Sequence, residues 1–189
     1  LRDYKAVMVL GHNEYWSVPM YRGTEAYLRR GGNLIVLSGN SLFWRVSFDV
    51  DCTVMRCRKA DVAGNRVPLT RRGGAWHSDG CVQRGLLRGC GWPGVNLIAL
   101  DCLGFNNPNL PAQFGPYIIE EGPHVLFKQP EDLGLKKGDA IGSAGDGVRF
   151  ANAHEFDIRP STFARLQEQP SPAGGVVPAD PAGITLLAN

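Results

Sequence analysis

The chain has 189 residues, of which 43% are apolar and 20% charged, and its formal net charge is +2. This length is enough for one soluble domain with a hydrophobic core. The near balance of 20 basic and 18 acidic residues argues against a nucleic-acid-binding protein, and no run of about 20 apolar residues marks a membrane span. The 24 glycines and 13 prolines predict a loop-rich fold.

The sequence begins at Leu1 without an initiator methionine or a signal peptide, and a predicted strand follows almost at once. We therefore expect residues 1–189 to be a single domain of a longer chain, and we expect that chain to be cytoplasmic. Residues 167–183 are rich in proline, glycine and alanine and predict a surface loop.

The five cysteines do not suggest a complete disulfide framework, because their number is odd and no CxxC pair occurs. Cys52, Cys57, Cys81 and Cys90 could bind zinc, but their spacings match no common zinc module. We predict that the cysteines are reduced and mostly buried small side chains.

A strand, a helix and a second strand are predicted near the start of the chain. The apolar runs from Lys5 to Leu10 and from Asn33 to Ser38 predict strands that are buried on both faces. Between them, Ser17 is a good N-cap, Pro19 suits the first helical turn, and the glycine pair after Arg30 ends the helix. The residues that recur at helical spacing are Met20, Thr24 and Leu28. This order predicts a parallel βαβ unit with a right-handed crossover.

The rest of the sequence is irregular, with short elements separated by turns. The predicted fold class is therefore α/β, with a parallel-sheet core and long irregular β-rich insertions. The short β-like runs are Val54 to Lys59, Val95 to Leu100, Tyr117 to Ile119 and Val125 to Phe127, followed by a turn at Gly134 to Asp139 and a last apolar run at Ile184 to Ala188.

Two segments rich in polar and aromatic residues follow the two predicted parallel strands. They are GHNEYWS at residues 11–17 and GNSLFWR at residues 39–45. Because ligands bind beyond the carboxyl ends of the strands in an open parallel sheet, we expect both segments to meet at one edge and form a site.

Two of the four histidines, His12 and His154, lie in polar clusters. His12 is at a strand end and His154 adjoins Glu155, so both are candidate proton carriers. For His77 and His124 we predict structural roles.

Tyr15 and Glu155 carry hard oxygen donors, which suit hard cations. On opposing loops they could form the oxygen part of an iron site, because a cation stabilises a phenolate. The alternative is that Tyr15 packs with Trp16 and Trp44 as an aromatic wall.

Cys102 is the candidate for a cysteine nucleophile, since Asp101 to Gly104 retains half of a nucleophile-elbow motif after a predicted strand. No helix signal follows it, which argues against this role. The glycine pairs at residues 31–32 and 73–74 match no nucleotide-binding motif.

Five segments resemble the C-terminal domain of the large (beta) subunit of N,N-dimethylformamidase and its relatives. They are GHNEYWS at 11–17, RRGGNLIVLSGNSLFWRV at 29–46, PYIIEEGPHVLF at 116–127, GLKKGDAIG at 134–142 and HEFD at 154–157. The resemblance implies a class I glutamine-amidotransferase-like, flavodoxin-like sheet that lacks the cysteine nucleophile of that fold.

The resemblance also implies a mononuclear ferric iron held by two tyrosinates and a glutamate, with a histidine nearby. Tyr15 in EYW corresponds to one tyrosine, and Glu155 in HEFD corresponds to the glutamate. The assisting histidine would be His12 or His154. The second tyrosine falls in a YWR motif that is FWR at residues 43–45 here. Phe43 has no donor atom, so a histidine or water would have to complete the iron shell.

We therefore expect an iron-dependent amide hydrolase that converts a small N-substituted formamide into an amine and formate with metal-activated water. Tyr15 and Glu155 would bind the metal, His12, His154 and Glu14 would be catalytic, and Asn40 and Trp44 would bind substrate. The alternative is a non-catalytic amidotransferase-like scaffold or binding domain that has lost the metal site. Expected partners are the small amide, other domains of the longer chain, a small second subunit and further copies in an oligomer, with no nucleic acid and no membrane.

Overall fold

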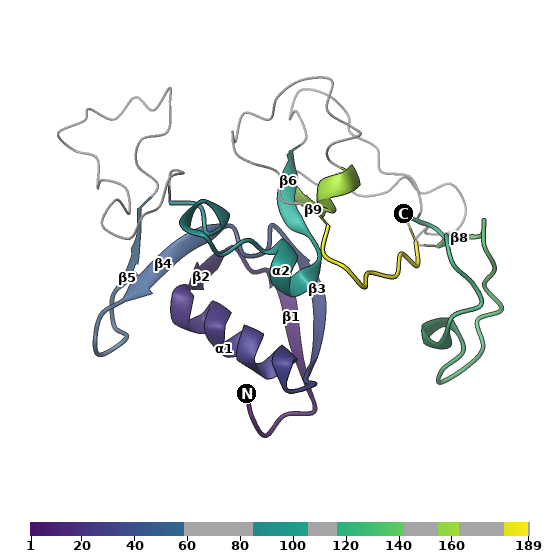
Figure 1. Cartoon of the computed structure of the whole chain (residues 1–189), viewed down its shortest axis with the longest axis horizontal. Coiled ribbons are helices and arrows are strands. Elements are labelled where there is room, and N and C mark those ends of the chain that lie inside the picture. Colours follow the sequence, from purple (N-terminus) through teal and green to yellow (C-terminus); the bar gives the residue numbers. More distant parts are fainter. Residues whose placement is uncertain (59–84, 106–116, 142–154, 163–179, 189) are drawn as a thin grey trace. The chain divides into compact units, whose positions relative to one another are not determined.

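The computed structural model describes residues 1–58, 85–105, 117–141, 155–162 and 180–188 (Figure 1). The chain divides into two units, Leu1–Gly104 with Glu155–Pro181, and Phe105–His154 with Ala182–Asn189. Most of the predicted loop at 167–183 lies outside the described residues. Among the residues that are described, no helix is both long enough and apolar enough to cross a bilayer.

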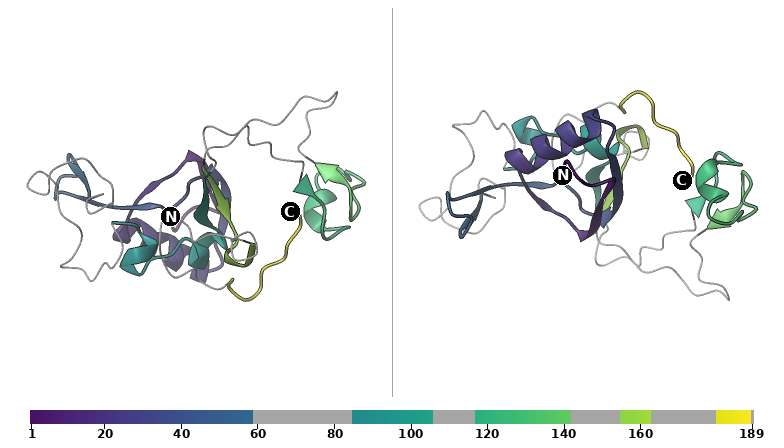
Figure 2. Two further views of the ribbon diagram at one scale, coloured as in Figure 1. Left: turned by 90° about the horizontal axis from the view of Figure 1, so that it is seen from above. Right: turned by 90° about the horizontal axis from the view of Figure 1, so that it is seen from below.

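The predicted strand, helix and strand at the start of the chain are confirmed. β1 (Ala6–His12) pairs with β3 (Asn33–Gly39) in parallel along its whole length. α1 (Val18–Arg29) connects them and runs alongside β1 in Figures 1 and 2. The hydroxyl oxygen of Ser17 caps the helix, since it accepts a hydrogen bond from the Met20 N–H at 3.3 Å.

The prediction that β1 and β3 are buried on both faces is wrong. Val9, Leu34 and Val36 face the hydrophobic core. The side chains that alternate with them form an exposed apolar face, with exposed fractions between 43% and 63%; they are Met8, Leu10, Ile35 and Leu37. Successive strand residues point to opposite faces, and the described elements cover only one of the two.

The buried face of α1 differs from the predicted one because it is built on tyrosines. The residues that it buries are Tyr21, Thr24 and Tyr27, whereas Met20 is 42% exposed. The Tyr21 hydroxyl donates to the Pro93 carbonyl at 2.8 Å, and the Tyr27 hydroxyl donates to the Tyr4 carbonyl at 3.1 Å. A buried tyrosine needs such an acceptor, which the spacing of apolar residues does not reveal.

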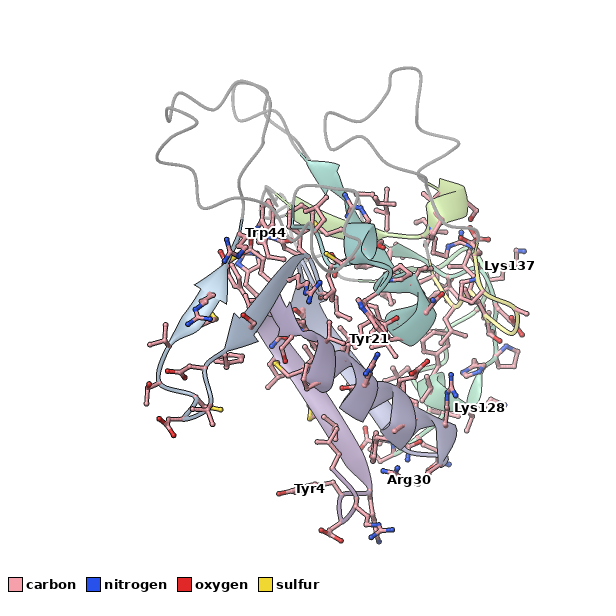
Figure 3. All side chains as sticks on the ribbon, turned by 60° about the vertical axis from the view of Figure 1, so that its left-hand side comes forward. Tyr4, Tyr21, Arg30, Trp44, Lys128 and Lys137 are labelled. Atoms are coloured by element: carbon pink, nitrogen blue, oxygen red, sulfur yellow. The ribbon has the colours of Figure 1, made fainter. Side chains whose placement is uncertain are left out.

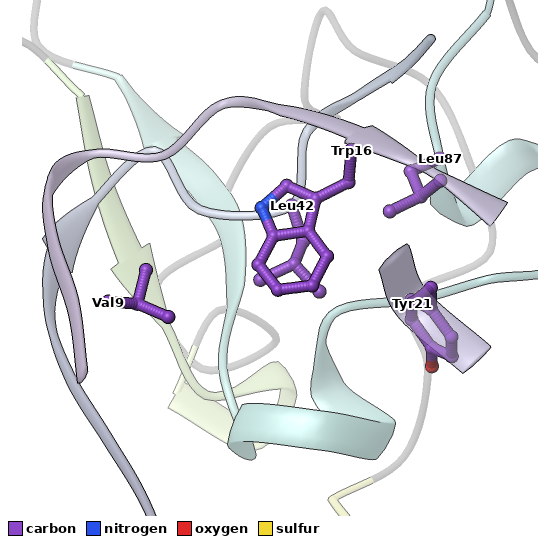
Figure 4. Close-up of a cluster of buried hydrophobic side chains, with 5 residues drawn as sticks. All are labelled: Val9, Trp16, Tyr21, Leu42 and Leu87. Atoms are coloured by element: carbon purple, nitrogen blue, oxygen red, sulfur yellow. The ribbon is translucent and has the colours of Figure 1, made fainter. Parts of the chain in front are cut away.

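The core of the first unit brings β1, β2 and α1 together with two loop segments. Its buried side chains are Val9, Trp16, Tyr21, Leu42 and Leu87 (Figure 4). Leu42 comes from the loop after β3, and Leu87 precedes the short 3-10 helix η3 (Arg88–Cys90). The loop that follows β3 is thus anchored in the core.

The described residues form three further small sheets besides the β1 and β3 pair. β2 (Tyr15–Ser17) pairs in parallel with β4 (Trp44–Phe48), which pairs antiparallel with β5 (Met55–Cys57). β6 (Asp101–Phe105) lies beside β9 (Glu155–Ile158). In the second unit, β7 (Tyr117–Ile118) and β8 (Ala140–Ile141) are antiparallel. The predicted strands at 54–59 and 117–119 are confirmed in shorter form.

Two predicted strands are helical instead. The apolar run from 95 to 100 forms α2 (Val95–Ile98), which ends at Ala99 with φ +60°, and β6 starts just beyond it. The run at 125–127 is the 3-10 helix η4 (Val125–Phe127). Short apolar runs fit a buried helix as well as a strand. His124 caps η4, because its Nδ1 accepts from the Leu126 N–H at 3.2 Å, and its predicted structural role is confirmed.

Gly32→Ala is expected to destabilise the first unit by about 1–3 kcal/mol, because the added Cβ would clash with the Tyr27 ring. Gly23→Ala in the exposed part of α1 is the matched control. No atom lies within 4 Å of its added Cβ, so we expect it to stabilise by about 0.5–1 kcal/mol. Urea denaturation followed by circular dichroism measures both, and equal effects of the two variants would contradict the close packing at Gly32.

Candidate functional site

The loops that follow β1 and β3 are hydrogen-bonded to each other. The Leu42 N–H donates to the Asn13 carbonyl at 3.0 Å. The N–H groups of Phe43 and Trp44 both donate to the Glu14 carbonyl, at 2.9 and 2.8 Å. The prediction that these two segments meet at one edge is therefore confirmed.

The candidate side chains at this edge differ in exposure. Tyr15 begins β2 opposite Trp44 in the register, and its side chain is 36% exposed. His12 ends β1 and is exposed, whereas Glu14 and Trp44 are half-buried. Figure 3 shows Trp44 at the opposite end of β1 from Tyr4. A solvent-borne ligand can therefore reach Tyr15 and His12 directly.

A half-buried carboxylate from β9 holds the loop after β3. Both carboxylate oxygens of Asp157 accept the Ser41 N–H, each at 3.1 Å. Burial raises the pKa of the Asp157 carboxyl, and hydrogen bonds from Ser41 and Asn40 act in the opposite direction. Asn40 is 1% exposed and has φ +50°. The substrate-binding role predicted for Asn40 stays a prediction.

The hydrogen bonds from the Ser41 N–H to Asp157 place residues 155–157 of the HEFD segment at this edge. β9 begins at Glu155, two residues before Asp157, so the backbone of the HEFD segment is joined to the loop after β3. His154 lies outside the described residues, and so does His77. The metal-binding role predicted for Glu155 stays a prediction.

Phe43 is part of the core and supplies no ligand. It is 7% exposed, meets the Trp44 ring edge-on with centroids 5.0 Å apart, and packs with Leu86 and Cys102. The guanidinium of Arg88 lies over its ring at 5.3 Å. Of the two phenols that the resemblance requires, this chain has Tyr15 at the edge and an aromatic ring without oxygen at position 43.

A buried ion pair lies next to the Phe43 ring. Nη1 of Arg88 donates to Oδ1 of Asp101 at 3.3 Å and to the Cys102 carbonyl at 3.1 Å, and the two charged side chains are 7% and 0% exposed. Burial raises the pKa of the Asp101 carboxyl, the Arg88 charge lowers it, and the charge of Asp157 raises it again. Oδ2 of Asp101 has no hydrogen-bond partner among the described residues.

The sequence did not reveal these charged side chains and their contacts. Asp157 alternates with Glu155 in a β-like segment, which is a signal for a second polar position on that strand. Arg88 and Asp101 are 13 residues apart in an irregular part of the sequence, and no motif predicts that they form an ion pair.

The prediction that the cysteines are reduced and mostly buried needs two corrections. Cys90 is disulfide-bonded, so the cysteines are not all reduced, and Cys52 is free but exposed. Cys102 forms no disulfide and is completely buried in β6, so no substrate from solvent reaches its thiol. In the described part of the chain, no three His, Cys, Asp or Glu side chains gather as a metal site.

The aromatic residues at this edge fit a ferric ion only in part. The phenol of Tyr15 is a hard oxygen donor and is accessible, so it suits such an ion. Phe43 does not. Of the two phenols that the resemblance implies, the described residues thus supply one at this edge.

These features define a mixed α/β domain with small sheets, some of them parallel, and a candidate site at the strand ends. The sequence profile of the family described as N,N-dimethylformamidase beta subunit-like, C-terminal, matches residues 1–188, and the chain belongs to this family. No curated protein and no solved structure matches the chain. The predicted family is confirmed, whereas the amidotransferase-like, flavodoxin-like sheet stays a prediction.

Proposed function

We propose that this chain is the amide-hydrolysing domain of a dimethylformamidase-type enzyme, acting on a small N-substituted formamide to give an amine and formate. One observation carries the proposal. The segment with Tyr15 is hydrogen-bonded to the loop after β3, and Asp157 ties that loop to the strand that begins with Glu155. Three segments far apart in a chain of this family therefore share one edge.

In this proposal Tyr15 and Glu155 hold a ferric ion, which when bound polarises an amide carbonyl or acidifies water. His12 or His154 moves the proton, because histidine changes protonation state near neutral pH, and Glu14 lies on the same loop. The half-buried ring of Trp44 lies opposite Tyr15 and offers an apolar surface to N-alkyl groups. Asn40, in the loop after β3, would donate to the substrate oxygen.

The family's description as part of a beta subunit supports the idea that other chains or domains accompany this one. We include other domains of the same longer chain, a small second subunit and oligomerisation in the proposal. Such partners would also be the source of iron ligands that Phe43 cannot provide.

Elemental analysis of the full-length protein, its visible absorption spectrum and an assay for formate release from N,N-dimethylformamide test the proposal together. We expect bound iron, a tyrosinate-to-iron charge-transfer band and hydrolysis. A protein that hydrolyses the amide without iron would overturn the metal site alone. An iron-free, colourless protein without hydrolysis would overturn the whole proposal. It would support the non-catalytic alternative, with which the missing donor atom at Phe43 is consistent.

A further inference from the structure

The turn after β3 holds two non-glycine residues in the left-handed backbone conformation. They are Asn40, with φ +50°, and Leu42, with φ +53°. A residue as large as leucine rarely adopts this conformation, which persists only where the surrounding structure holds it. Both residues are 1% exposed, and Leu42 packs in the core with Trp16 (Figure 4). Contacts around the turn must therefore fix its shape.

Asp157 supplies those contacts from a strand 116 residues further along the chain. Ser41 lies between the two left-handed residues and is completely buried, and its N–H donates to both carboxylate oxygens of Asp157 at 3.1 Å. The Asn40 backbone and the Cys102 thiol also form hydrogen bonds with this carboxylate. Backbone N–H groups bind an ionised carboxylate more strongly than a neutral oxygen. Asp157 thus holds the turn at its strained residues.

The shape of this turn sets the place of Tyr15. The N–H groups of Phe43 and Trp44, which directly follow the turn, donate to the Glu14 carbonyl at 2.9 and 2.8 Å. Tyr15 comes next after Glu14 and starts β2 opposite Trp44 in the register. A change in the shape of the turn would therefore move the backbone that carries the Tyr15 phenol.

On its other side, Asp157 belongs to the strand that begins with Glu155. Residues two apart in a strand are separated by about 6–7 Å along it, and β9 lies beside β6. β6 begins at Asp101, whose buried carboxylate is bound by Arg88. Asp157 therefore joins the turn that fixes Tyr15 to a strand whose first residue is Glu155.

We propose that Asp157 is a positioning residue of the candidate iron site. It holds the turn of residues 40–42 against β9 and thereby sets the separation between the Tyr15 and Glu155 segments, without touching the iron itself. This inference rests on the proposed function, because it takes those two residues as the iron ligands.

Asp157→Ala and Asp157→Asn separate positioning from direct ligation. Alanine removes the acceptor of the Ser41 N–H, so we expect the folded full-length protein to bind iron about 10–100-fold more weakly, with a weaker tyrosinate-to-iron band. Asparagine keeps an oxygen that accepts this N–H, so most of the iron affinity should return. Asp180→Ala is the matched control and should leave iron binding unchanged, since Asp180 accepts the Ser161 N–H at 2.9 Å in the same unit.

Two results would overturn the proposal. A folded Asp157→Ala protein with the iron affinity and absorption of Asp180→Ala would show that Asp157 positions no ligand. An Asp157→Asn protein as poor in iron as Asp157→Ala would make the carboxylate a direct ligand instead. If Asp157→Ala does not fold, Asp157→Glu replaces it. The added methylene should displace the turn and weaken iron binding about tenfold, and unchanged iron binding would contradict the proposal.

Hydrogen exchange in the iron-free protein distinguishes failure of this inference from failure of the proposed function. The Ser41 amide should exchange about tenfold or more faster in Asp157→Ala than in Asp157→Asn or Asp180→Ala, because only the first variant loses its acceptor. Equal exchange in the three variants would overturn the link between β9 and the turn. Faster exchange in Asp157→Ala, together with a wild-type protein that has neither iron nor hydrolysis, would overturn the proposed function and with it the positioning role, while the link itself would stand.

Discussion

Replacing Arg88 by methionine is expected to lower the free energy of unfolding by about 3–5 kcal/mol at neutral to mildly alkaline pH. Arg88 is the ion-pair partner of Asp101, and both side chains are buried, at 7% and 0% exposure. Methionine keeps much of the volume but leaves the Asp101 carboxylate buried without a cation. The Cys102 carbonyl and the Phe43 ring also lose their contact with the guanidinium. Chemical denaturation of the full-length protein measures the loss.

The pH dependence of that loss identifies its cause. A carboxyl whose folded-state pKa lies above its ordinary value of 3.8 contributes stability that is present below 3.8 and is lost as the pH rises through the folded pKa. Burial already raises the pKa of Asp101, and removal of the Arg88 charge, which lowers it, raises it further. The deficit of Arg88→Met should therefore shrink as the pH falls toward the acid range.

Two companion variants complete this test. Arg88→Met combined with Asp101→Asn removes both charges, so most of the lost stability should return. Arg29→Met is the matched surface control, because its ion pair with Glu25 is 2.8 Å long but 76% and 36% exposed; we expect a loss below about 1 kcal/mol. A double variant as unstable as Arg88→Met alone, or a deficit that does not change with pH, would show that packing and not charge holds this region.

The elements that the sequence predicts correctly are those that local residue signals mark. Ser17, Pro19 and the glycines after Arg30 act within a few residues of themselves, and α1 begins and ends where they indicate. The parallel pairing of β1 with β3 follows from two apolar runs joined by that helix. The meeting of the loops with Tyr15 and Phe43 then follows from the topology alone.

The remaining differences come from contacts between distant residues. Tyr21 is buried because its hydroxyl reaches the Pro93 carbonyl, 72 residues away. Whether a strand has one or two covered faces depends on what packs on it, so the exposure of Leu37 had no sequence signal. The tie between Asp157 and Ser41 spans 116 residues, beyond the reach of any local pattern.

Tyr15→Phe is expected to remove the charge-transfer band and most of the bound iron, and to lower kcat/KM for N,N-dimethylformamide by about 100-fold or more. The substitution deletes the one phenol oxygen that the described residues place at this edge and leaves the ring in register with Trp44. Tyr4→Phe is the matched control, since the Tyr4 side chain is 66% exposed at the opposite end of β1 (Figure 3). Iron content and absorption of a folded Tyr15→Phe protein equal to those of Tyr4→Phe would contradict a ligand role for Tyr15.

Phe43→Tyr tests whether the second phenol ligand of the iron belongs at position 43. If the FWR segment corresponds to the family's YWR motif, the added hydroxyl should raise iron retention during dialysis against a chelator and strengthen the charge-transfer band. Phe48→Tyr, at the end of β4 and 42% exposed, controls for the effect of a new tyrosine. The ring at position 43 packs against Trp44, Leu86 and Cys102, so the hydroxyl adds a buried polar atom that only a ligand or hydrogen-bond partner can compensate. A folded Phe43→Tyr protein that binds iron no better than Phe48→Tyr would therefore locate the missing ligand in another segment or another chain.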